Sequence, residues 1–135
     1  MIRLLYISDA KEGITEETVD SILQNAARNN PPLDITGVLI YAGNVWAQVL
    51  EGPAQNVMKK YLAIAKDARH SNCRLVLIST VTDRVFKDWS MAALEALPLE
   101  LEHIAELDAY RKESVPADTF ISLVNHFLAR LTPIP

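Results

Sequence analysis

The chain of 135 residues has one cysteine, four separated glycines and no excess of basic residues. The lone Cys73 cannot form an internal disulfide and reads as an inert small apolar residue, as is typical of a reduced, cytoplasmic protein. Thirteen Lys and Arg stand against seventeen Asp and Glu, so the formal charge of −4 gives no basic surface for nucleic acid. The isolated glycines exclude a dinucleotide fingerprint and a P-loop.

Long apolar runs and metal-ligand spacings are absent as well. No stretch approaches the roughly 20 apolar residues of a membrane span, and the N-terminus lacks the apolar core of a signal peptide. The motifs CxxC and HExxH do not occur, and His70, His103 and His126 show no ligand spacing. We therefore expect no metal site, no membrane and no nucleic-acid partner, and a binding or sensing domain instead of an enzyme.

The composition that remains is typical of one globular domain, with 50% hydrophobic and 22% charged residues. Apolar alternation predicts strands at residues 2–8, 35–41, 45–51, 75–81 and 89–94. Apolar residues at helical spacing predict one helix from the N-cap Thr15 to near Asn30, where two prolines follow, and another from Pro53 to near residue 68. This order predicts an α+β, ferredoxin-like sandwich with a five-stranded mixed sheet and two helices on one face.

The composition changes after Pro98, where residues 99–110 and 117–131 predict two short C-terminal helices. The apolar face of the second comprises Ile121, Val124, Phe127, Leu128 and Leu131. Leu123 adds to an apolar surface that packs either on the open face of the sheet or on a partner. We interpret this tail as part of the same domain.

Four polar residues occupy positions where the pattern calls for apolar ones. Tyr6 and Gln48 lie on apolar strand faces, and Asn29 and Asn30 end the first helix. A buried amide costs about 1–3 kcal/mol for each group left without a partner, so Gln48 needs a donor and an acceptor nearby. The four side chains can surround a flat heteroaromatic ligand. They can equally be a half-buried tyrosine, helix terminators and a strand glutamine facing water.

Five segments, in order and in register over residues 1–95, resemble the BLUF domain, a flavin-binding sensor of blue light. The departures from the family pattern are Trp46, where another aromatic is usual, and the prolines after Asn30. The segments are residues 4–8 (LLYIS), Asn30 with 34–41 (DITGVLIY), 46–53 (WAQVLEGP), 67–70 (DARH) and 84–91 (RVFKDWSM).

The resemblance implies a site for a flavin, with FAD as the family default and FMN and riboflavin as alternatives. Residues 1–97 would be the flavin-binding domain and 98–135 its helical extension. Tyr6 and Gln48 would be the photochemical pair, and Trp89 and Met91 would compete for the place beside Gln48 to carry the signal. The residues implied to bind the cofactor are Tyr6, Ile22, Asn29, Asn30, Leu39, Gln48, Leu50, Ile64, Arg69 and His70.

The same resemblance implies a mechanism. Blue light would excite the flavin, Tyr6 would supply an electron and a proton through Gln48, and recombination would leave the Gln48 amide rotated or tautomerised. No substrate is converted. In 135 residues there is no room for a cyclase or phosphodiesterase domain, so the chain would act in trans on an effector protein or through a homo-oligomer.

Two alternatives compete with this interpretation. The first is a small ferredoxin-like enzyme of the acylphosphatase kind, which needs an anion-binding loop rich in Gly and Arg; residues 8–13 (SDAKEG) are too acidic for one. The second is a colourless ferredoxin-like interaction module without a cofactor. Outside these alternatives, the charged pair Lys59 and Lys60 is interpreted as a solvated helix face.

Overall fold

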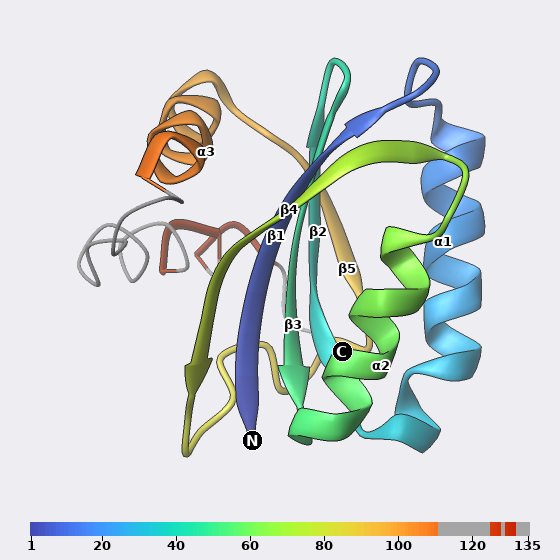
Figure 1. Ribbon diagram of the computed structural model, residues 1–135, viewed down its shortest axis with the longest axis vertical. Coiled ribbons are helices and arrows are strands. Elements are labelled where there is room, and N and C mark those ends of the chain that lie inside the picture. The colour runs from blue at the N-terminus through green and yellow to red at the C-terminus, as the bar shows by residue number, and fades with distance from the viewer. Residues whose placement is uncertain (111–124, 128, 132–135) are drawn as a thin grey trace.

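The computed structural model describes residues 1–110, 125–127 and 129–131 (Figure 1). Each expected strand and helix of the first 110 residues is present, and three of the expected ends are shifted by three residues or more. The described elements are β1 (Ile2–Ala10), α1 (Glu16–Asn29), the 3-10 helix η1 (Pro31–Leu33), β2 (Thr36–Ala42), β3 (Val45–Gly52), α2 (Ala54–Ala65), β4 (His70–Thr80), β5 (Ala92–Glu95) and α3 (Pro98–Tyr110).

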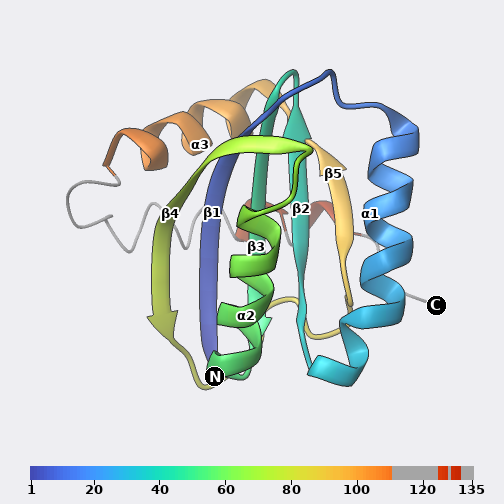
Figure 2. The same ribbon diagram turned by 45° about the vertical axis from the view of Figure 1, so that its right-hand side comes forward.

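The strands form one sheet in the order β4-β1-β3-β2-β5. Neighbouring strands are antiparallel except for β2 and β5, which run parallel, so the sheet is mixed. Helices α1 and α2 cover one face, and α3 packs on the other (Figures 1 and 2). This is the expected α+β, ferredoxin-like sandwich with one added strand.

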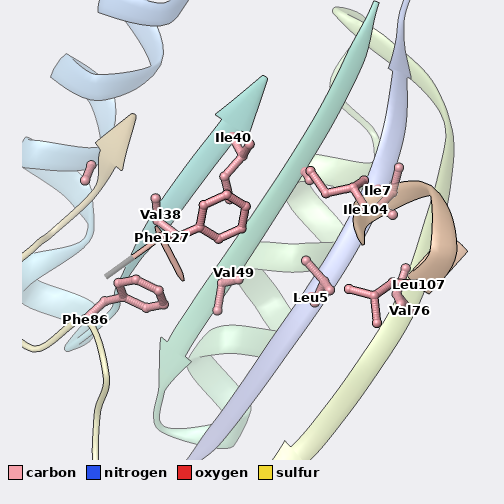
Figure 3. Packing of buried hydrophobic residues seen from close by; sticks show 12 residues of the cluster. Leu5, Ile7, Val38, Ile40, Val49, Val76, Phe86, Ile104, Leu107 and Phe127 are labelled. Carbon is pink, nitrogen blue, oxygen red and sulfur yellow. The ribbon is translucent and has the colours of Figure 1, made fainter. Parts of the chain in front are cut away.

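The two faces of the sheet carry separate apolar clusters, as the alternation along the strands predicts. Leu4 and Tyr6 of β1 point towards α1 and α2, where they join Val19, Val57 and other residues. Leu5 and Ile7 point to the opposite face, into a cluster that also comprises Val38, Ile40, Val49, Val76, Phe86, Ile104, Leu107 and Phe127 (Figure 3). Both faces of the central strands are therefore buried.

Helix α1 begins and ends where its sequence signals place it. The Thr15 hydroxyl accepts a hydrogen bond from the Thr18 backbone N–H at 3.2 Å, which caps the helix. The helix stops at Asn29 because Pro31 cannot continue it, and the chain turns through η1 instead. This ending places Asn30, which is fully buried, beside the sheet.

Three predicted boundaries are wrong by three residues or more, and local contacts explain each. Helix α2 ends at Ala65 and not near residue 68, because the Asp67 carboxylate accepts the Arg69 backbone N–H at 2.9 Å and turns the chain. Strand β4 begins at His70 instead of residue 75, since residues 70 and 71 already pair with β1. Strand β5 begins at Ala92 instead of residue 89, because Trp89 closes a turn with Phe86.

The predicted helix over residues 117–131 falls largely outside the described residues, and so do Ile121, Leu123, Val124 and Leu128. Of its apolar face, Phe127 is buried in the cluster opposite the α1 and α2 layer, and Leu131 packs against that cluster. Among the helices that the structure describes, none has the length and apolar character needed to cross a bilayer.

A buried carboxylate fixes the segment that leads from β4 to β5. Glu51 of β3 is fully buried and accepts hydrogen bonds from the backbone N–H of Val85 at 3.0 Å and of Phe86 at 2.6 Å. Its counter-ion is Arg3, at 2.7 Å. Arg84 extends the same attachment by donating to the Thr36 hydroxyl at 2.8 Å. A loop without regular structure is thus tied to the centre of the sheet.

We predict that Glu51→Gln lowers the free energy of unfolding by about 3 kcal/mol, because it leaves Arg3 without its buried counter-ion. Urea denaturation measures the change, and Glu102→Gln on the exposed face of α3 is the matched control. A loss in Glu51→Gln no larger than in the control would contradict the anchoring role.

Candidate functional site

A cavity of about 380 Å³ lies between α1 and α2, and residues of β1, β2 and β3 also line it. It contains nearly every residue that the sequence singled out for a ligand. The exception is Leu50, which is buried in the core on the same face but does not line the cavity. The lining residues are Tyr6, Ile22, Asn25, Ala26, Asn29, Asn30, Leu39, Trp46, Gln48, Lys60, Ala63, Ile64, Asp67, Arg69 and His70.

Tyr6 and Gln48 form the centre of the site. They face each other directly across the antiparallel ladder of β1 and β3. The Tyr6 hydroxyl donates to Gln48 Oε1 at 2.5 Å, and both side chains are buried. Burial raises the pKa of Tyr6 far above its usual value near 10, so the hydroxyl keeps its proton and acts as a donor.

Met91, and not Trp89, occupies the place beside Gln48. The Gln48 amide Nε2 donates to Met91 Sδ at 3.2 Å, and Met91 belongs to the same buried cluster as Tyr6. Trp89 is partly buried against the cluster on the opposite face of the sheet. Neither residue lies within β5, which begins at Ala92. The two residues expected to compete therefore lie on opposite sides.

Asn30 presents an unsatisfied acceptor at the cavity. Its Nδ2 donates to the Ser90 carbonyl at 2.8 Å, while its Oδ1 is buried and has no hydrogen-bond partner among the described residues. An unmade hydrogen bond of this kind costs about 1–3 kcal/mol. The neighbouring Asn29 also lines the cavity but is exposed. An N–H donor of a ligand in the cavity would satisfy Asn30.

The other end of the site contains Asp67, Arg69 and His70. Arg69 donates twice to Asp67, at 2.6 Å from Nη2 and 3.0 Å from Nε, and this pairing lowers the pKa of Asp67 to about 2. The His70 ring donates from Nε2 to the Ile64 carbonyl. In the neutral ring, Nδ1 then accepts from the buried Ser8 hydroxyl at 2.6 Å. His70 is therefore held in place by α2 and β1.

The sequence interpretation missed Ser8, which contacts His70, and six residues that line the cavity: Asn25, Ala26, Trp46, Lys60, Ala63 and Asp67. The sequence does indicate a place for Ser8 at the site, because it lies two residues after Tyr6 and therefore on the same face of β1. Lys60 precedes Ile64 by one helical turn, so it faces the cavity, and its interpretation as a solvated residue is wrong. Asn25 precedes Asn29 by one turn of α1 in the same way. Trp46 lines the cavity as well as packing in the core.

The arrangement binds and orients a ligand. Within the residues that the structure describes, no group of three or more His, Cys, Asp or Glu can hold a metal ion. What the cavity offers is apolar walls from Ile22, Leu39 and Ile64, together with amide and hydroxyl groups at defined positions. Such a set suits a flat, largely apolar molecule with one polar edge.

Comparison with known proteins identifies the domain. The family model described as "BLUF: Sensors of blue-light using FAD" matches residues 1–92. The beta subunit of the photoactivated adenylate cyclase of Euglena longa is 32% identical over 91 residues, which are 67% of this chain and 11% of that protein. A blue light- and temperature-regulated antirepressor of Escherichia coli (strain K12) is 32% identical over 98 residues, 73% of this chain and 24% of that protein.

The solved structures agree with the family match. The photo-activated state of the protein BlsA superposes with a TM-score of 0.77 at 26% identity, covering 94% of each chain. The matches cover only a small part of the length of the two relatives above. With the family model matching residues 1–92 and a solved member of similar fold, the chain belongs to the BLUF family of blue-light sensors.

Proposed function

We propose that this chain senses blue light through a flavin held in the cavity between α1 and α2, and passes the signal to a partner protein. The observation that carries the proposal is the continuous hydrogen-bonded chain Tyr6–Gln48–Met91, with Gln48 at the cavity. The side-chain amide of glutamine donates and accepts through different atoms, so its rotation or tautomerisation reverses what it presents to each neighbour.

The residues present fit a flavin. The free Asn30 Oδ1 accepts an N–H at the pyrimidine edge of the ring, and Ile22, Leu39 and Ile64 supply apolar contacts. Asn29 and Arg69 line the more exposed part of the cavity, and His70 stands at the end away from Asn30. When bound, the flavin supplies absorption of blue light and one-electron redox chemistry. We propose FAD as the natural cofactor, in keeping with the description of the family.

Within the protein, the first change is at Gln48. In the structure described, its oxygen is occupied by Tyr6 and its nitrogen faces the Met91 sulfur, a weak acceptor. We propose that a proton moves along the hydrogen bond from the Tyr6 hydroxyl and returns after the Gln48 amide has rearranged. The Gln48 oxygen then no longer faces Tyr6. The contact with Met91 then changes, and Met91 directly precedes β5. We propose that β5 and the C-terminal helical residues carry the signal.

The effector is proposed to be a separate protein, or another copy of this chain. The relatives named above carry out cyclase or antirepressor functions by their names, and the present chain matches only their sensor parts. The sensor character of the family supports a switch and not a catalyst. The homo-oligomer, the cytoplasmic location and the division at residue 97 remain predictions.

The deciding experiment is an absorbance spectrum of the purified protein in darkness and after blue light. We expect a flavin spectrum that shifts slightly to the red and recovers in the dark, because a stronger hydrogen bond to the ring lowers the transition energy. A flavin spectrum without the reversible shift would contradict the switching mechanism. A colourless protein that takes up no added flavin would favour the cofactor-free interaction module.

Gln48→Leu tests the role of the amide. We expect the variant to retain bound flavin and lose the red shift entirely, because leucine neither donates nor accepts. Gln24→Leu, on the exposed part of α1 away from the cavity, is the matched control and should shift like the wild type. A normal shift in Gln48→Leu would refute the mechanism.

The raised pKa of Tyr6 predicts a pH dependence of stability. In the unfolded chain this hydroxyl ionises near pH 10, whereas in the folded protein burial keeps it protonated, so the free energy of unfolding falls as the pH rises above about 10. Between about pH 9 and pH 11 the wild type should lose about 1 kcal/mol more than Tyr6→Phe. Tyr61, with its pKa raised to about 12, contributes equally to both proteins. Equal losses, measured by urea denaturation, would contradict the burial of a protonated Tyr6.

A further inference from the structure

The polar groups of the cavity divide into a buried set and an exposed set. Tyr6, Asn30 and Gln48 are buried, and all three are uncharged in the folded protein. Asn25 and Asn29 are exposed, and Lys60 is half-buried. The isoalloxazine ring of a flavin is itself uncharged, so neutral amides and a hydroxyl suffice to bind its polar edge. The charged side chains of the cavity are therefore available for another part of the ligand.

Of the cationic side chains lining the cavity, only that of Lys60 has no carboxylate partner in the part of the chain that the structure describes. Arg69 is neutralised by Asp67 through three short contacts. Lys60 makes no hydrogen bond or ion pair with the described residues, and burial alone lowers the pKa of its ammonium group. A partly desolvated ammonium without an anion is destabilising, and an anionic group on the ligand would offset that cost.

The opposite wall of the cavity adds to the positive potential. Asn25 of α1 lines the cavity, and its Oδ1 accepts a hydrogen bond from Arg28 Nη2 at 2.8 Å. Among the described residues no partner takes the Asn25 amide nitrogen, so it is available as a donor. Arg28, which does not itself line the cavity, is a second cation for which the described residues provide no carboxylate partner. Lys60 on α2 and the Asn25–Arg28 pair on α1 thus favour an anion at the exposed part of the cavity.

We propose that Lys60 binds the phosphate of a flavin nucleotide, and that this contact makes the site prefer phosphorylated flavins to riboflavin. The inference rests on the proposed function, since it names the part of the flavin that Lys60 recognises. A lysine ammonium is a compact point charge on a flexible four-carbon chain, which suits a phosphate on the mobile end of a ligand. The amide of Asn25 supplies a further donor to the same group.

FMN and riboflavin test this inference, because they differ only in the phosphate. The 135-residue chain is prepared without flavin and titrated with each ligand, following the quenching of flavin fluorescence. We expect FMN to bind the wild type about tenfold more tightly than riboflavin, the effect of one hydrogen bond to a charged group. In Lys60→Met the ratio should fall to about one through weaker FMN binding alone, and in Lys60→Arg it should be largely kept.

Lys59→Met is the matched control, because Lys59 is the exposed neighbour in α2 and does not line the cavity. It should keep the wild-type ratio, and the thermal midpoints of all variants establish that they fold. No preference for FMN in the wild type would overturn the inference and leave the proposed function intact. So would an equal loss of both ligands in Lys60→Met, which would place Lys60 against the ring. Failure of both ligands to bind the wild type would refute the proposed function as well.

Discussion

The structure depends on satisfying the hydrogen-bonding groups of one buried amide in the middle of a sheet. Gln48 lies on β3, a central strand, and its oxygen and nitrogen are served by residues from two other segments. Tyr6 reaches the oxygen only because β1 and β3 pair in the register that sets the two residues opposite each other. A slip of one residue would turn either side chain to the other face. Burial of an unsatisfied amide is costly, so the register of the sheet and the geometry of the site support each other.

The segment between β4 and β5 is positioned by contacts on both faces of the sheet. On one face, Glu51 holds the backbone of Val85 and Phe86. On the other, the Asn30 amide donates to the Ser90 carbonyl, and Met91 packs beside Gln48. Glu51 and Gln48 are three residues apart on β3, so the carboxylate and the amide point to opposite faces of the sheet. The site residues are thus part of the framework that orders the loop.

Much of this arrangement could be predicted from the sequence, because period-two alternation assigns each strand residue to a face. That rule assigned Tyr6 and Gln48 to apolar strand faces, the family resemblance paired them, and the prolines placed Asn30 at a helix end. The start of β4 was missed because its polar residues look like a loop, and Asn72 adopts a left-handed backbone conformation with a φ of 50°. Which of Trp89 and Met91 lies beside Gln48 depends on the packing of the whole sheet, so the sequence alone left it open. Lys60 was missed because charge alone suggested solvent.

The attachment of residues 85 and 86 to Glu51 has a mechanical consequence. The five residues from Lys87 to Met91 are fixed at one end by those backbone hydrogen bonds and at the other by the parallel pairing of β5 with β2. A segment that is fixed at both ends cannot swing open about one of them. If Met91 moves, either residues 87–91 must stretch or β5 must slide against β2. The direction of that sliding runs along the strand, towards the residues that lead into α3.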